Sequence, residues 1–483
     1  ATSETCFGKD CADHESCFVT QLRRQALNAD LIIVNHHLFF ADLALRAGGI
    51  GEVLPMPDAV IFDEAHHLEE TATHFFGRSI NLLRFWSLKT DLLKALPKDT
   101  DAIQGLLAEL AGLEGHAQEL FDRLAGLITR GERNPVPAAL IKTPDISALY
   151  KTTSESLSRL AGAITSEGRM GEIGSSLESR CLDLLSDLSF ILNQPEIGWV
   201  YYASWVGKKG DILTLKAAPV DLSEIFQKLL FTEHKTTAFT SATLAVNDAF
   251  HYFRSRISLL DNEPVEERLL EPVFDYMNQA LMYVPERLPS PGSDHFISKI
   301  LPEIISLIEL TEGRAFVLFT SYKNLHACHN QLKGRIQYPL LVQGEGSREG
   351  ILSRFRSEPS VLLGTSSFWE GVDVPGGLLS LVIIDRLPFD SPGDPIIGAR
   401  LDFIREQGGN PFQHFQLPRA ALTLKQGFGR LIRRKTDRGI VAIMDRRLLE
   451  KTYGQTLLNT LPRSRRTRDF SVVKRWWEKD LES

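Results

Sequence analysis

The chain has 483 residues, a length that suits about three domains. Hydrophobic residues make up 43% and charged residues 24%, the balance of an ordinary globular protein, and no apolar run reaches the roughly 18 residues of a membrane span. The net charge of −7 gives no argument for nucleic-acid binding, which would need local basic patches.

The first segment, residues 1–28, is polar and contains three of the five cysteines. So few cysteines in a long chain argue against a secreted disulfide scaffold and indicate a reduced, cytoplasmic setting. The chain starts with Ala1 rather than Met and shows no signal peptide, which is consistent with a processed or truncated start. The cysteines are Cys6, Cys11, Cys17, Cys181 and Cys328, and the last two lie in apolar helical sequence typical of buried core thiols.

Two continuous apolar runs follow, at residues 29–40 and 57–67, and each predicts a buried parallel strand. The second run ends in Asp63, Glu64, Ala65 and His66 (D-E-A-H). At the carboxyl end of a parallel strand, Asp63 is placed to bind magnesium through water, and Glu64 to polarise the water that attacks a γ-phosphate. The structural alternative is an acidic helix start with Asp63 as N-cap.

The hydrophobic period then changes to that of helices, so residues 80–192 are predicted to form an all-helical insertion. Strand patterns return at residues 198–207, 211–220 and 235–244. The last of these, in FTSATL, is expected to place the hydroxyls of Ser241 and Thr243 beside the two carboxylates, although a plain strand-to-turn junction explains it equally well.

A second α/β region begins after Pro264. Its apolar runs alternate with helical patterns, which predicts βαβ units and a parallel sheet, so the fold class is α/β. The predicted strands are residues 314–321, 339–343, 361–367, 379–389 and 439–445.

Two motifs in this region suit a nucleotide. In SSFWEGVDVPGG (366–377), glycines around Glu370 and Asp373 permit close backbone approach to a ligand. KQGFGRLIRR (425–434) has the pattern Q-x-x-G-R-x-x-R. Its arginines lie three apart, so on a helix they would share one face and suit phosphates; a solvated basic helix is the alternative.

Together these motifs resemble the iron–sulfur branch of the superfamily 2 helicases that includes XPD, and most of all its DinG/YoaA group. The resemblance rests, in chain order, on ADLIIVNHHLFF, VIFDEAHHLEE, FTSATL, FVLFTSY, SSFWEGVDVPG, DRLPFDSPGDP and QGFGRLIRR. It implies two RecA-like motor domains, the first in residues 29–79 and 193–263 and the second in 264–483. The helical block at 80–192 would be the arch domain.

The resemblance also implies roles for individual residues. Asp63, Glu64 and His66 would be the magnesium, catalytic and coupling residues of motif II. The motif V residues would be Glu370, Gly371 and Asp373. The motif VI residues would be Gln426, Arg430 and Arg433, with both arginines acting as fingers on ATP.

Family members hold a [4Fe–4S] cluster on four cysteines, as thiolate-bound clusters require. Cys6, Cys11 and Cys17 would be three of these ligands, with the fourth upstream of residue 1. A zinc site that uses His14 is the alternative. The sequence contains no G-x-x-x-x-G-K-[ST] phosphate loop, so the expectation is that the chain begins inside the cluster region and that its first motor domain is incomplete. A natural ATPase-dead relative is the other explanation.

Nucleic-acid contacts are expected in three places. Lys9, Arg23 and Arg24 flank the cluster, where family members separate strands, and Trp369 is either a stacking surface or a core residue. Residues 462–479 hold seven basic residues and two tryptophans. This tail is read as a single-strand contact, as a helix packed on the second motor domain, or as a docking site for a replication protein.

The function that the resemblance implies is an ATP-dependent 5′–3′ DNA helicase acting on single-stranded or forked DNA in repair or replication. Partners would include a clamp-loader subunit or a single-strand-binding protein, with no membrane. A non-catalytic nucleic-acid or replisome-binding protein that keeps the fold is the alternative, and a DinG-type nuclease is a weaker one.

Overall fold

The computed structural model describes residues 11, 13–47, 52–96, 102–130, 133–167, 170–207, 210–231, 236–259, 264–365, 368 and 376–479. The chain forms two compact units. The first contains Ala1–Thr240 with Ser391–Gly408, and the second contains Ser241–Asp390 with Gly409–Ser483. Within the described ranges, no helix combines the length and apolarity needed to cross a membrane.

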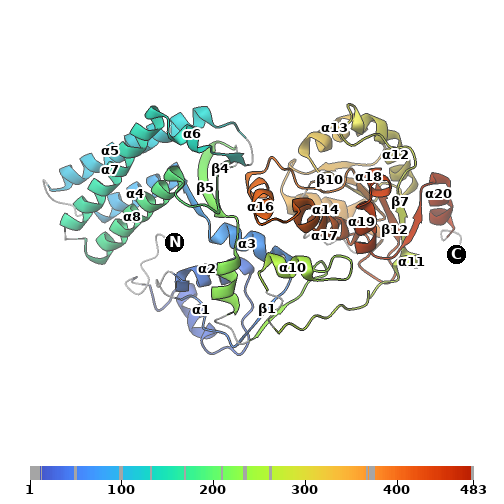
Figure 1. The fold of residues 1–483 in the computed structure, drawn as a ribbon, viewed down its shortest axis with the longest axis horizontal. Coiled ribbons are helices and arrows are strands. Elements are labelled where there is room, and N and C mark those ends of the chain that lie inside the picture. The colour runs from blue at the N-terminus through green and yellow to red at the C-terminus, as the bar shows by residue number, and fades with distance from the viewer. Residues whose placement is uncertain are drawn as a thin grey trace. The chain divides into compact units, whose positions relative to one another are not determined.

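The larger part of the first unit is a layer of long helices on an antiparallel sheet. Of the four long helices, α7 packs against both α5 and α8, and α4 packs against both α8 and α5 (Figure 1). The sheet has the order β2-β5-β4-β3. These elements are α4 (Leu82–Ala95), α5 (Ala102–Leu127), α6 (Ala138–Ile141), α7 (Pro144–Glu167) and α8 (Gly171–Asn193), with β2 (Arg78–Asn81), β3 (Asn134–Pro135), β4 (Trp199–Val206) and β5 (Ile212–Pro219).

The sheet changes the boundary that was predicted between the helical block at 80–192 and the first motor domain at 193–263. Alternate residues of its strands, such as Ile80, Ala203 and Leu215, enter the same buried cluster as the helices. The block is therefore not all-helical, and residues 199–219 pack with the helices rather than with the strand that precedes the D-E-A-H sequence. The reason is the two-residue period of a strand, which sends every second side chain to the helical core.

The rest of the first unit is built around two short parallel strands, β1 and β6, which pair with each other. In the described part of the chain, neither of them pairs with a further strand. The elements here are α1 (Phe18–Ala26), α2 (His36–Ala47), β1 (Ala59–Phe62), η2 (Ala65–His67), α3 (Leu68–Phe75), α9 (Ser223–Phe226), η3 (Gln227–Phe231) and β6 (Thr236–Phe239).

The strand predicted in residues 29–40 is wrong. Residues 29–35 are irregular, and Leu31 and Ile33 are 76% and 88% exposed. From His36 onward the chain is helix α2, which Asn35 caps by accepting the Leu38 N–H at 2.8 Å. A strand is held by hydrogen bonds to a neighbouring strand, and no described strand pairs with this segment.

The second unit is a seven-stranded sheet of order β13-β7-β12-β11-β8-β10-β9, with every pair parallel. The central strands are buried along their whole length, because helices cover both faces of a parallel sheet. All five strands predicted after Pro264 are confirmed. The strands are β7 (Ala280–Tyr283), β8 (Ala315–Leu318), β9 (Leu340–Val342), β10 (Val361–Gly364), β11 (Leu381–Ile384), β12 (Gly439–Ile443) and β13 (Arg465–Thr467).

Polar caps start several helices of this unit. Ser321 caps α13 and Ser347 caps α14, each by accepting a backbone N–H three residues on. The helices are α10 (His251–Arg256), α11 (Tyr276–Gln279), α12 (Phe296–Leu310), α13 (Tyr322–Leu332), α14 (Arg348–Ser357), η4 (Gly376–Leu378), η5 (Phe412–Gln416), α17 (Leu417–Phe428), α18 (Arg447–Glu450), α19 (Gly454–Thr460) and α20 (Phe470–Glu478).

One helix, α16 (Pro395–Glu406), belongs to the first unit although its chain neighbours belong to the second. Its Ile396 joins a small buried cluster with Val200 and Tyr202 of β4. The second motor domain was predicted to span residues 264–483, but residues 391–408 within this range belong to the first unit.

Candidate functional site

The D-E-A-H sequence leaves the carboxyl end of β1, as predicted. Phe62 pairs with Phe239 of β6, so the residues that follow both strands emerge at one edge. There the Thr240 hydroxyl donates to Asp63 Oδ1 at 2.9 Å, and the Glu64 N–H donates to the same oxygen at 3.0 Å. The Thr240 carbonyl accepts the Ala65 N–H at 3.0 Å. The Asp63 carboxylate is thus exposed but held in place, as a ligand for a hydrated cation must be.

Glu64 has a left-handed backbone, with φ of +47°. This conformation is unfavourable for a residue other than glycine, and such strain gathers at functional sites. It turns the Glu64 carboxylate to within 3.4 Å of His66 Nδ1. The structure thus brings together all three predicted motif II residues, Asp63, Glu64 and His66.

Two further residues support this site, and neither of them was predicted from the sequence. One is Thr240, described above. The other is His36, at the start of α2, whose pKa is lowered by burial and raised again, in part, by a hydrogen bond with the Asp63 backbone. The available signal for His36 was the polar stretch N-H-H, one residue before the Phe39–Phe40 pair.

The expected hydroxyl pair needs correction, because the hydrogen bond to Asp63 comes from Thr240, one residue before Ser241. Ser241 and Thr243 lie 3.3 Å apart, oxygen to oxygen, and belong to the second unit. There Thr243 Oγ1 accepts a hydrogen bond from Gln426 Nε2 at 3.4 Å. FTSATL is therefore the segment at which the chain passes from one unit to the other.

The two arginines of Q-x-x-G-R-x-x-R do not share a helical face. Helix α17 ends at Phe428, and Gly429 is its C-cap. The following loop is pinned by the buried Asp437, whose Oδ2 accepts the N–H groups of Arg433 and Arg434 at 2.8 Å each. Gln426 thus lies in the last turn of the helix, while Arg430 and Arg433 lie in a fixed loop beyond it.

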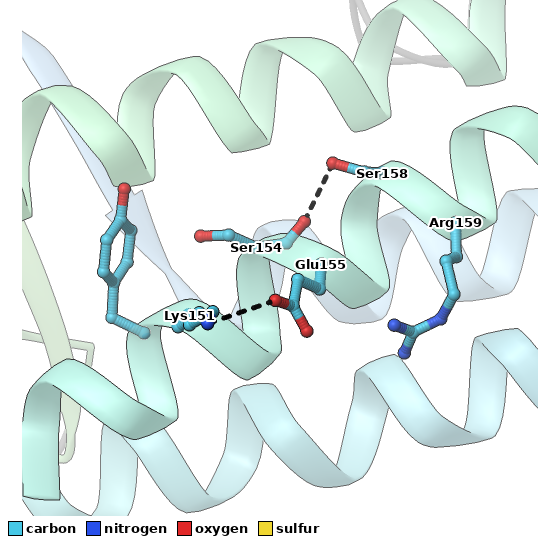
Figure 2. Close-up of a pocket in the computed structure, with 6 residues that line it drawn as sticks. Lys151, Ser154, Glu155, Ser158 and Arg159 are labelled. Carbon is cyan, nitrogen blue, oxygen red and sulfur yellow. Dashed lines mark hydrogen bonds and ion pairs between the residues drawn. The ribbon is translucent and has the colours of Figure 1, made fainter.

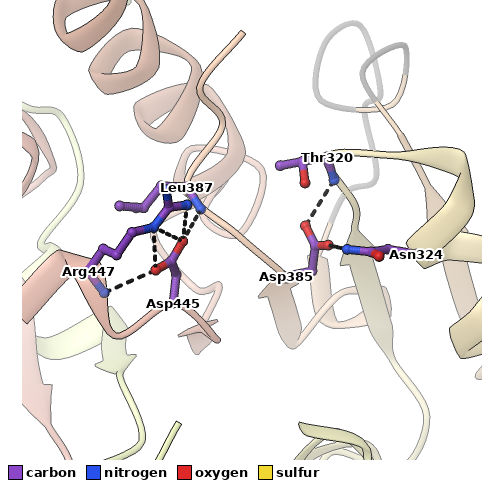
Figure 3. Close-up of polar contacts among 6 residues, drawn as sticks. All are labelled: Thr320, Asn324, Asp385, Leu387, Asp445 and Arg447. Carbon is purple, nitrogen blue, oxygen red and sulfur yellow. Dashed lines mark hydrogen bonds and ion pairs between the residues drawn. The ribbon is translucent and has the colours of Figure 1, made fainter. Parts of the chain in front are cut away.

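Two aspartates that the sequence analysis did not single out lie deep at the carboxyl edge of the second sheet. Asp385 follows β11 and is fully buried; it accepts the Thr320 N–H at 2.9 Å and the Asn324 amide at 2.7 Å (Figure 3). Burial raises its pKa, and these hydrogen bonds oppose that effect.

Asp445 follows β12 and is also fully buried. Its carboxylate accepts the Leu387 N–H at 2.9 Å and pairs with Arg447 at 2.6 Å (Figure 3). The two aspartates fix the loops that follow three neighbouring strands at the edge where ligands bind in such sheets. The available signal was that two apolar runs, LSLVIID and GIVAIMD, both end in Asp.

The predicted cysteine ligands are only partly within the described residues. Cys11 and Cys17 are free and half-buried, whereas Cys6 and the neighbouring Lys9 lie outside the described residues. Cys17 caps helix α1, and backbone N–H groups of Thr20 and Val19 lower its pKa, which favours the thiolate that metals bind. In the part of the chain that is described, no group of three or more metal-ligating side chains occurs.

The structure describes only some of the other residues that were predicted to contact DNA or the nucleotide. Arg24 donates from both terminal guanidinium nitrogens to the carboxylate of the exposed Glu15, at 2.6 and 2.7 Å. Arg23 lies beside it in the last turn of α1. The motif V residues and their neighbour lie outside the described residues; they are Trp369, Glu370, Gly371 and Asp373.

The basic C-terminal segment is folded rather than a free tail. Residues 465–467 form β13 at the edge of the sheet, and Trp476 and Trp477 in α20 pack against the core of the second unit. The guanidinium of Arg438 lies 3.8 Å from the Trp476 ring centroid. Of the three interpretations, packing on the second unit is therefore the one these contacts support.

A shallow, open depression of about 430 Å³ lies on α7, in the helical part of the first unit (Figure 2). Its charged groups are engaged with other side chains: Lys151 lies 4.0 Å from Glu155, and Arg159 lies 3.0 Å from Glu109. The depression shows no convergence of catalytic groups. It is lined by Tyr150, Lys151, Ser154, Glu155, Ser158 and Arg159.

Comparisons with known proteins show which family the chain resembles. A family model described as a helicase C-terminal domain matches residues 304–464. The chain is 39% identical over 486 residues to the ATP-dependent DNA helicase YoaA of Escherichia coli, covering 99% of this chain and 73% of the relative. It is 30% identical over 500 residues to the ATP-dependent DNA helicase DinG of Photobacterium profundum, covering 95% and 71%.

Among solved structures, an XPD helicase matches with a TM-score of 0.59 at 17% identity, over 92% of this chain and 74% of that one. At that identity the likeness concerns the fold alone. The extent and identity of the sequence matches show that the chain belongs to the DinG/YoaA family of ATP-dependent DNA helicases.

Proposed function

We propose that this chain couples ATP hydrolysis to 5′-to-3′ movement along single-stranded DNA. Its relatives are named ATP-dependent DNA helicases, which supports DNA binding and the use of ATP with magnesium. The observation that carries the proposal is the edge of β1, where Asp63 is held by two donors and Glu64 has a strained backbone.

The proposed roles follow from charge and placement. Asp63 would hold magnesium through water, and Glu64 would accept a proton from the attacking water. His66 would couple ATP hydrolysis to movement of the motor domains. Gln426, Arg430 and Arg433 would bind the phosphates, because guanidinium groups match the geometry of phosphate oxygens. The residues proposed to line the same nucleotide are Glu370, Gly371 and Asp373.

The direction of movement is tested with forked duplexes that carry either a 5′ or a 3′ single-stranded arm. The assay uses the chain with a phosphate-loop segment supplied in cis, because residues 1–483 contain no G-x-x-x-x-G-K-[ST] sequence. We expect ATP-dependent unwinding of the 5′-armed duplex only. Unwinding of the 3′-armed duplex alone would contradict the polarity. DNA binding without ATP turnover would favour the non-catalytic alternative.

We further propose that Cys6, Cys11 and Cys17 ligate an iron–sulfur cluster. The fit rests on Cys17, whose place at the start of α1 favours the thiolate. A bound cluster would cross-link the segment around α1. Close to it, Arg23 and Arg24, with Lys9, are proposed to contact single-stranded or forked DNA. A clamp-loader subunit and a single-strand-binding protein are the proposed protein partners.

Replacement of Cys17 by serine tests the cluster. Because serine is a poor iron ligand, we expect bound iron and acid-labile sulfide in anaerobically purified protein to fall to background. His14→Ala is the matched control and should leave both unchanged. Zinc in the unchanged protein that is lost on replacing His14 would instead favour the zinc site.

A further inference from the structure

The sheet β2-β5-β4-β3 has a second face, which does not join the helical core. On this face, Val200 and Tyr202 of β4 and Ala218 of β5 pack with Ile396 of α16. Farther along the strands the same face becomes polar. Tyr202 pairs across the ladder with Lys216, and Ser204 pairs with Thr214, so these four side chains form two adjacent cross-strand pairs on one side.

Lys216 is a half-buried cation on this face. No described carboxylate lies within ion-pair distance of it, and its Nζ lies 6.0 Å from the Tyr202 ring centroid. Burial lowers its pKa, and the nearby charge of Arg133 lowers it further. Binding of an anion would stabilise the charged form of an ammonium group in this setting.

The surroundings of Lys216 add positive charge. Arg133 lies 3.0 Å from the Asp394 carboxylate, which also accepts the Ile396 and Ile397 N–H groups as the cap of α16. The pKa of His74 on α3 is lowered by burial and then by the charges of Lys216, His37 and Arg133, so these groups lie close together. Asp394 is thus paired with Arg133, whereas no described carboxylate pairs with Lys216.

Ser204 supplies an independent observation. It is only 5% exposed, and its hydroxyl oxygen has no hydrogen-bond partner in the structure. A buried polar group without a partner is costly, and such a group points to a ligand or an ordered water. By strand alternation, its side chain lies on the same face as Tyr202, beside the cross-strand pair that includes Lys216.

We propose that Lys216, Arg133 and Ser204 bind a backbone phosphate of the DNA strand. This inference rests on the proposed DNA-dependent function and adds a contact on the face of the sheet β2-β5-β4-β3 that does not join the helical core. The chemistry fits one phosphodiester group: an ammonium and a guanidinium supply charge, and a buried hydroxyl donates a hydrogen bond.

The test compares Lys216→Gln with the unchanged chain in binding a fluorescent single-stranded oligonucleotide over a series of salt concentrations. We expect Kd to rise about tenfold at low salt, and the slope of log affinity against log salt to fall by about 0.7, the value for one phosphate contact on a single strand. Lys216→Arg should restore most of the affinity, and Ser204→Ala should weaken it less. Lys151→Gln, a solvent-facing lysine on α7, is the matched control and should change neither quantity.

Chemical protection gives a second measurement that does not depend on a variant. Acetylation of Lys216, followed by mass spectrometry, should be slowed by the oligonucleotide and hardly at all by inorganic phosphate at the same phosphate concentration. Equal protection by inorganic phosphate, or none by either, would overturn the assignment to DNA. If the chain bound no DNA but inorganic phosphate protected Lys216, both this inference and the proposed function would be contradicted. If the chain bound DNA and Lys216→Gln left that binding unchanged, only this inference would be contradicted.

Discussion

Replacement of Glu64 by glutamine is expected to reduce DNA-stimulated ATP hydrolysis by at least about 10²-fold, the scale of a lost general base. Glutamine keeps the size of the side chain and its place beside His66, but it cannot accept a proton from water. Binding of single-stranded DNA should stay within about twofold, because Glu64 is not among the residues proposed to contact the strand. ATP turnover and oligonucleotide binding are measured on the same preparation, with a phosphate-loop segment supplied in cis.

Glu70→Gln is the matched control, since it makes the same chemical change on an exposed residue of α3. It should leave turnover unchanged. Turnover that survives Glu64→Gln would show that another group activates the water, and would remove Glu64 from its proposed role.

The second large effect is expected on stability. Arg400 of α16 and Glu69 of α3 form an ion pair of 2.9 Å in which both side chains are almost fully buried. The Arg400 guanidinium also donates to the Thr73 hydroxyl at 2.8 Å. Glu69→Ala would leave a buried guanidinium without its countercharge, which costs about 3–5 kcal/mol. Hydrogen exchange in α16 should then speed up by roughly 10²-fold to 4 × 10³-fold, because each 1.4 kcal/mol is a factor of ten.

The control lies on the same helix. Asp402 and Arg405 form an exposed ion pair, and such pairs contribute at most about 1 kcal/mol. Asp402→Ala should therefore change exchange in α16 by less than about fivefold. If Glu69→Ala and Asp402→Ala had equal effects, the buried pair would not be what anchors α16.

The second sheet was largely predictable from sequence, because its strands are buried on both faces and continuous apolar runs mark them directly. The fold of the first unit was less so. Residues 29–35 are as apolar as a core strand, but a strand also needs a hydrogen-bonded neighbour, and that information lies elsewhere in the chain. Likewise, local pattern cannot show that β4 and β5 share a core with helices α4 to α8.

The candidate site was predictable in part for similar reasons. D-E-A-H lies at a strand end, so its placement followed from the apolar run before it. The hydroxyl from Thr240 depends on the register between β1 and β6, and a shift of one residue moves a side chain to the other face. The end of α17 depends on Gly429 and on the buried Asp437, whose role appears only once the loop is folded.

The assignment of α16 to the first unit has a consequence for synthesis on the ribosome. Residues 1–240 cannot complete their fold until residues 391–408 have emerged, and about 150 residues of the second unit are made in between. At about 5–20 residues per second, this interval lasts roughly 8–30 s. Throughout it, the apolar side chains of β4 and β5 that α16 covers in the finished protein are open to solvent. The nascent chain is thus expected to be a chaperone client during this interval, and slowing translation between residues 241 and 408 should lower its soluble yield.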